Sequence, residues 1–113
     1  MTNSSIGAQA RAALARLHET LPLAAQLGVP ILAGTDESPA GSVAREVAQL
    51  RRFGLSAVAA LAAASTNAQA YLGLPAFGAG ASADLVTFAA DPRSDPEALA
   101  KPAAVVRAGR RIV

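Results

Sequence analysis

The sequence predicts an α/β fold, because one short buried strand lies between helical stretches and strand patterns follow toward the C-terminus. The apolar run over residues 29–34 is too short for a helix and is bounded by Gly28 and Gly34. Pro30 cannot donate a backbone hydrogen bond, so we expect it at the start of the strand or beside an unpaired position. With 113 residues, the chain has the length of one domain.

The stretch before this strand has the spacing of an amphipathic helix from about Ala8. Its leucines recur at i, i+3 and i+7, as Leu14, Leu17 and Leu21. We expect Pro22 to end or kink this helix, and Gly28 to stop a second short helical piece. Residues 1–7 are polar and are expected to form a disordered N-terminus.

Two more helices are predicted after the strand. Ser42 and Ser56 each precede a helical pattern, and a serine hydroxyl suits the N-cap position. The first of these helices is expected to end at Gly54. The second is expected to turn Val58 and Leu61 toward the core.

The C-terminal part of the chain changes from helical to strand patterns. A short helix over residues 66–72 is expected to stop at Gly73, and a strand is predicted over residues 85–88. Residues 105–113 have the pattern of a closing hairpin. Residues 78–83 match the spacing G-x-G-x-x-A, but a loop precedes them and a strand follows. We therefore expect no dinucleotide cofactor there.

Composition and charge exclude several classes of function. Ten Lys and Arg against eight Asp and Glu give a net charge of +2, without a basic patch, so no nucleic-acid partner is expected. The absence of cysteine excludes disulfides and thiolate metal sites. No apolar run is long enough for a membrane span, and no secretion signal is evident, so we expect a cytoplasmic protein.

The candidate functional residue is Asp36, which follows the predicted strand directly. The carboxyl ends of strands in α/β folds are where ligands bind and catalytic groups emerge. The alternative is that Thr35 and Asp36 merely turn the chain and cap the next helix. The lone histidine, His18, lies within a helical pattern and is expected to be a surface or boundary residue rather than a ligand.

Short motifs follow one another along the chain at residues 28–36, 45–47, 53–56, 60–61, 65–68, 72–74, 80–86, 91–92 and 106–113. Their order and spacing resemble the end of a metal-dependent amidohydrolase, most closely of the imidazolonepropionase-like branch. The resemblance runs from about residue 10 to the end of the chain.

This resemblance implies an incomplete (β/α)8 barrel fragment. Residues 8–75 would be its last helix–strand–helix units: the seventh helix, the eighth strand at 29–34 and the eighth helix. Residues 76–113 would be a C-terminal β-strand segment with a hairpin, belonging to the small composite β-domain of such enzymes.

The resemblance also implies a role for Asp36 as the strand-end aspartate of the family. There it binds the catalytic divalent metal, zinc most often, and takes a proton from the attacking water. The residue type suits both tasks, because a carboxylate is a hard oxygen ligand and a general base. The implied reaction is hydrolysis of carbon–nitrogen bonds other than peptide bonds.

The sequence departs from the family in its other ligands. The first-strand His-x-His pair, the metal-bridging lysine and the two later histidines are absent, and His18 precedes the strand and cannot replace them. Where close relatives have His-Arg-Glu, this chain has Ala44-Arg45-Glu46. Since a catalytic zinc needs about three protein ligands, we expect no metal on this chain alone.

Three hypotheses follow. In the first, the chain is a hydrolase fragment, inactive alone, and is either a truncated gene product or a separately encoded piece that pairs with an N-terminal partner. The isolated fragment is expected to self-associate through the open edges of its strand. In the second, it is a non-catalytic small α/β binding or assembly module. In the third, oligomerisation assembles a metal site from Asp36 and His18 of several subunits.

Overall fold

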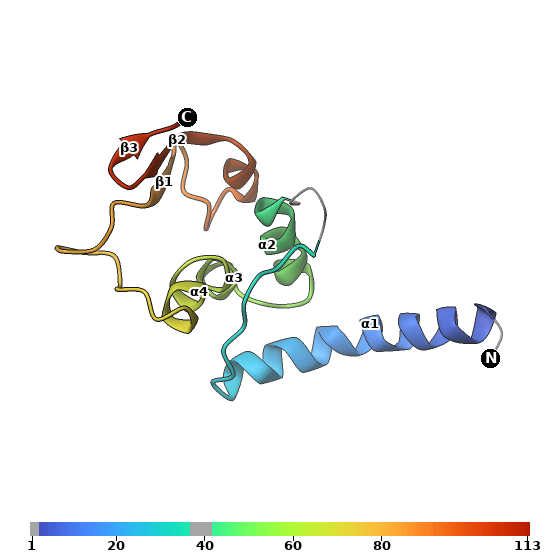
Figure 1. Cartoon of the computed structure of the whole chain (residues 1–113). Helices are drawn as coiled ribbons and strands as arrows, with labels where there is room; N and C mark the ends of the chain where they lie inside the picture. Colours follow the sequence, from blue (N-terminus) through green and yellow to red (C-terminus); the bar gives the residue numbers. More distant parts are fainter. Residues whose placement is uncertain (1–2, 37–41) are drawn as a thin grey trace.

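The computed structural model describes residues 3–36 and 42–113 and has the predicted mixed α/β composition (Figure 1). Its elements, in chain order, are α1 (Asn3–Gln26), α2 (Val43–Arg52), α3 (Ala57–Ala63), α4 (Thr66–Tyr71), β1 (Leu85–Phe88), the 3-10 helix η1 (Pro96–Ala100), β2 (Pro102–Arg107) and β3 (Arg110–Arg111). Within the described residues, no helix combines the length and hydropathy that a bilayer crossing requires.

Helix α1 is longer than the sequence predicts. It includes residues 3–7, which the sequence analysis assigns to a disordered start, and it continues through Pro22 to Gln26. Pro22 has no N–H for the carbonyl of His18 one turn earlier, which is why a break was expected. Packing offsets this loss: the Pro22 ring lies so close to Gly54 that a Cβ there would come within 2.7 Å of Pro22 Cγ. The predicted end of the helix at Pro22 is therefore wrong.

The end of α1 is closed at Gly28, as predicted. Gly28 has a φ of +79° and its N–H donates to the Ala25 carbonyl at 3.1 Å. The N–H of Val29 donates to the Ala24 carbonyl at 2.9 Å. These two bonds form a Schellman motif, in which a left-handed glycine satisfies the last helical carbonyls.

We expect Gly28→Ala to destabilise the chain by about 1 kcal/mol, because a left-handed backbone brings Cβ close to the following carbonyl. No atom outside the neighbouring residues lies within 4 Å of the added Cβ, so backbone strain alone would cause the loss. Gly34→Ala is the matched control, because its Cβ also faces open space and its φ is not in the left-handed region. Urea denaturation of both variants checks this, and equal losses would contradict it.

Residues 29–34 are extended but form no β-strand, so this part of the prediction is wrong. Side chains alternate along the segment, with Ile31 and Ala33 half-buried and Leu32 exposed, as in a strand with one covered face. The described part of the chain places no second strand beside it, and a β-ladder needs a neighbour to complete its hydrogen bonds. The apolar pattern therefore predicts the extended conformation of residues 29–34, but the pairing with a neighbouring strand is not found among the described residues.

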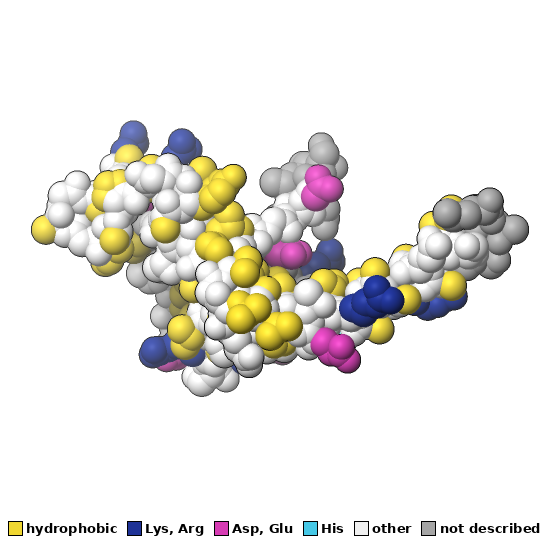
Figure 2. Space-filling model, turned by 90° about the horizontal axis from the view of Figure 1, so that it is seen from below, with side chains coloured by type: hydrophobic (Ala, Val, Ile, Leu, Met, Phe, Trp, Pro, Cys, Tyr) yellow, Lys and Arg dark blue, Asp and Glu magenta, His cyan; other side chains and the backbone are white. Residues whose placement is uncertain are grey.

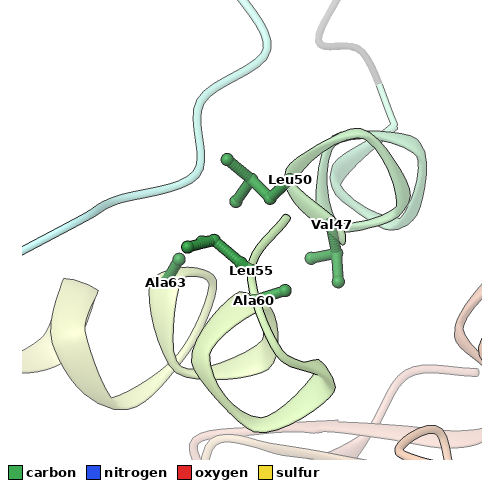
Figure 3. Packing of buried hydrophobic residues seen from close by; sticks show 5 residues of the cluster. All are labelled: Val47, Leu50, Leu55, Ala60 and Ala63. Carbon is green, nitrogen blue, oxygen red and sulfur yellow. The ribbon is translucent and has the colours of Figure 1, made fainter. Parts of the chain in front are cut away.

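The core lies between α2 and α3. Ser42 and Ser56 cap these helices as predicted, accepting hydrogen bonds from the Arg45 and Ala59 N–H groups at 3.2 and 3.1 Å. The side chains that point toward one another in Figure 3 are Val47, Leu50, Leu55, Ala60 and Ala63. The prediction for Val58 is wrong, since its side chain is 62% exposed. The alanines of α3 face α2 instead, because small side chains allow close approach.

The predicted strand and hairpin are confirmed as an antiparallel sheet in the order β1-β2-β3. Ala108 and Gly109 form the two-residue turn between β2 and β3, with φ values of 48° and 78°. The Asp84 carboxylate accepts a 2.7 Å hydrogen bond from the Ala108 N–H, which ties the start of β1 to this turn. That bond, with a further contribution from Ser82 and the charge of Arg107, lowers the pKa of Asp84 below its usual value.

We expect the Asp84–Ala108 contact to weaken in acid. The pKa of Asp84 is lower in the folded state than its ordinary value of 3.8. The contact therefore contributes to stability at pH values above 3.8, and this contribution is lost as the pH falls through the lower folded-state pKa. Asp84→Asn keeps an acceptor oxygen and should remove this pH dependence. NMR titration of the Ala108 amide measures it. Asp91→Asn is the control, because Asp91 bonds Arg93 within its own turn, and an equal effect of Asp91→Asn would contradict the assignment.

Candidate functional site

The candidate residue Asp36 lies at the end of the extended segment, immediately before residues 37–41, which the structure does not describe. Its backbone has a φ of 47°, in the left-handed region, and its side chain is exposed. Asp and Asn adopt this region more readily than other residues with a Cβ. Helix α2 is capped by Ser42, so Thr35 and Asp36 do not cap it, and this part of the alternative is wrong.

Two hydrogen bonds attach the segment before Asp36 to the helices. The N–H of Ala33 donates to the Ala63 carbonyl at the end of α3, at 2.9 Å. The side-chain amide of Asn67 in α4 donates to the Ile31 carbonyl at 3.3 Å. These contacts fix the direction in which the segment leaves the helical layer, and so the position at which Asp36 emerges.

Sequence reasoning gave Asn67 no role beyond a possible helix start. The available signal was a short polar run, residues 65–67, in the middle of alanine-rich helices. A polar residue that interrupts an apolar stretch often satisfies a buried backbone group, here a carbonyl of the extended segment. Asn67 is therefore a positioning residue in the structure, and its partner could not be deduced from the sequence.

His18 belongs to a different contact. Its ring packs against Phe53, with ring centroids 5.0 Å apart and an interplanar angle of 52°. Phe53 follows α2 and directly precedes Gly54, so the histidine helps to hold α1 against the α2–α3 connection. This agrees with the prediction of a boundary residue.

The residues present do not by themselves make a metal centre. Among residues 3–36 and 42–113, no group of three or more His, Asp or Glu side chains is placed to hold an ion. A catalytic zinc needs about three protein ligands, whereas the sequence predicts one, Asp36. The donor set of the described chain therefore does not fit a divalent metal without ligands from elsewhere.

Comparison with known proteins decides the family. Residues 4–112 match the family model described as "Amidohydrolase family". The chain belongs to the amidohydrolase family. The mixed α/β architecture, with helices followed by a three-stranded antiparallel sheet, is consistent with a fragment of an amidohydrolase domain.

Three mycobacterial relatives of this amidohydrolase chain have the same similarity to it. They are the uncharacterized proteins Mb2939c of Mycobacterium bovis (strain ATCC BAA-935 / AF2122/97), MT2982.1 of Mycobacterium tuberculosis (strain CDC 1551 / Oshkosh) and Rv2915c of Mycobacterium tuberculosis (strain ATCC 25618 / H37Rv). Each is 42% identical over 99 residues, which cover 85% of this chain. The chain spans only 27% of the length of these relatives. No solved structure matches it.

Proposed function

We propose that the chain is the C-terminal portion of a cytoplasmic amidohydrolase of the imidazolonepropionase-like branch, which hydrolyses carbon–nitrogen bonds other than peptide bonds. The portion is inactive alone and becomes part of an active site when the rest of the domain joins it. In this proposal residues 29–34 become the eighth strand of a (β/α)8 barrel once neighbouring strands pair with them, α1 is the seventh helix, and residues 76–113 belong to the small β-domain.

The observation that supports this proposal most directly is the setting of Asp36. It ends an extended apolar segment that has the alternation of a strand but no neighbouring strand among the described residues. The chain spans 27% of the length of its relatives, and the proposal assigns the flanking strands and the other site residues to the part of them that the chain does not match. A carboxylate at a strand end is well placed to accept a proton from a water molecule.

Members of this family generally use a divalent metal, and we propose that Asp36 provides one oxygen ligand to it. A carboxylate suits a divalent cation, and the metal would acidify a bound water when it is present. The remaining ligands must come from the joining polypeptide, because the described residues offer no group of three.

The experiment is reconstitution with Rv2915c as the source of the missing portion. The part of Rv2915c that this chain does not match is co-expressed with the chain, and hydrolysis of a panel of cyclic and linear non-peptide amides is measured with zinc present. We expect activity from the pair and none from either polypeptide alone. Activity of the chain alone, with stoichiometric zinc that is lost in Asp36→Asn, would replace this proposal with the oligomeric metal site.

A non-catalytic assembly module is the second candidate. The capped helices α2 and α3 and the hairpin that Asp84 closes are held by hydrogen bonds within the chain itself. If the isolated chain is monomeric and unfolds in one cooperative transition at high temperature, and the reconstituted pair hydrolyses nothing, this second candidate is favoured.

A further inference from the structure

A large apolar groove lies between the helices and the sheet. Its volume is about 990 Å³, and side chains from both layers line it. The helical wall includes Val43, Leu61 and Leu72, and the sheet wall includes Val86, Phe88 and Val105. The groove is not part of the proposed catalytic site, because Asp36 is not among the residues that line it.

The chain exposes more surface than a compact monomer of its mass. The chain exposes 8190 Å², whereas a compact monomer of 11.3 kDa exposes about 5,700 Å². Its radius of gyration of 16.5 Å also exceeds the value of about 13 Å for a compact domain of this length. Part of the excess belongs to α1, which extends beyond the body, and part to the apolar side chains gathered on the body (Figures 1 and 2).

The excess is about 2,500 Å² in total, and only the share of it that lies on the body rather than on α1 is available to an interface at the groove. Stable interfaces of standard size bury about 800 Å² on each partner, and obligate ones bury more and are more apolar. The apolar lining of the groove agrees with an obligate interface.

A second copy of the chain is a poor occupant. A two-fold interface brings the same patch of both copies together, and a concave groove cannot fill another concave groove. The projecting half of α1 could enter the groove of a neighbour, but its described residues 5–16 offer only Ile6 and Leu14 as large apolar side chains among small and polar ones. A polypeptide segment from the part of the domain that this chain does not match is therefore the better occupant.

The free edge of the sheet indicates how that polypeptide enters. β1 pairs with β2 along one edge only, and its other edge has no strand beside it among the described residues. The exposed side chain of Val86 on this strand also lines the groove. An added strand could take up the free backbone groups of β1 while its apolar side chains fill the space between sheet and helices.

We infer that the groove between α2–α4 and β1–β2 is the docking surface for an apolar strand-forming segment of the polypeptide that completes the domain. The inference rests on the proposed function, since it names the surface through which the two polypeptides join. It adds that this surface lies apart from Asp36, so joining and hydrolysis depend on different residues.

The test compares three substitutions to lysine, two inside the groove and one outside. Val86→Lys and Leu72→Lys place a charge on opposite walls of the groove, and either variant suffices if the other fails to fold by circular dichroism. Val58→Lys is the matched control, because Val58 is exposed and does not line the groove. The probe is the unmatched part of Rv2915c. As a positive control, this probe is first co-expressed with the segment of Rv2915c that matches the chain, and the two must form a complex.

We expect both groove variants to weaken binding of the probe at least about tenfold, because a charge is buried in place of an apolar side chain, while Val58→Lys stays within about twofold. Hydrogen exchange at residues 85–88 should slow in the complex. A complex that all three variants form equally well overturns the docking surface but leaves the proposed function standing. If the unchanged chain does not bind the probe, the proposed pairing fails as well. If Val86→Lys instead abolishes self-association, a second copy is the occupant.

Discussion

Asp36→Asn should abolish hydrolysis by the reconstituted pair, with a loss of about 10²–10⁴-fold in rate, the range for removing a general base. Asparagine is the right replacement, because it matches aspartate in shape and tolerates the left-handed backbone at this position. Only the charge and the proton-accepting oxygen are removed. Steady-state hydrolysis of the panel of amides, measured with the same amount of pair, checks this.

Glu19→Gln on the exposed surface of α1 is the control, since it also removes one carboxylate charge. The thermal stability of the free chain should be the same for Asp36→Asn and the unchanged chain, because the carboxylate is exposed. A pair with Asp36→Asn that keeps most of its activity would remove Asp36 from the proposed chemistry.

Leu50→Ala should destabilise the chain by about 2–5 kcal/mol, the usual cost of deleting a buried leucine side chain. Leu50 is 8% exposed and contacts the cluster between α2 and α3. Few large side chains share this core, because the buried members of α3 are the alanines Ala60 and Ala63. Since small domains are marginally stable, the loss is a large part of the total. Urea denaturation followed by circular dichroism measures it.

Leu14→Ala is the control for side-chain size and helix propensity. Leu14 lies within α1 and is 52% exposed, so this change should stay within about 0.5 kcal/mol of the unchanged chain. Similar losses in both variants would mean that the helical layer is loosely packed and that the cluster around Leu50 is not a specific core.

Most of the secondary structure follows from local signals between residues close together in the chain. Ser42 and Ser56 cap helices because a hydroxyl can reach an N–H three residues ahead, and Gly28 ends a helix because glycine adopts a positive φ. These effects act within one turn of helix. The outcome at Pro22 depends on Gly54, far away in the sequence, and no local pattern contains that contact.

The site is less predictable than the fold, because its parts come from several elements. The pattern of residues 29–34 gave an extended conformation and placed Asp36 at its end. It could not show that Asn67 and the Ala63 carbonyl hold the segment, since these partners lie about thirty residues later. Likewise, Val58 and Ala60 fit a helical stripe almost equally well, and only the approach of α2 decides which of them is buried.

The two hydrogen bonds that attach the extended segment to α3 and α4 have a consequence for the order of assembly. In the proposed pair, they would let the helices hold the segment extended before a neighbouring strand pairs with it, so that the segment would lose less backbone entropy when the second polypeptide binds. The groups that the segment contributes to these bonds are the Ala33 N–H and the Ile31 carbonyl. The second polypeptide would then pair with a segment that is already extended, and only its own backbone would become ordered on binding.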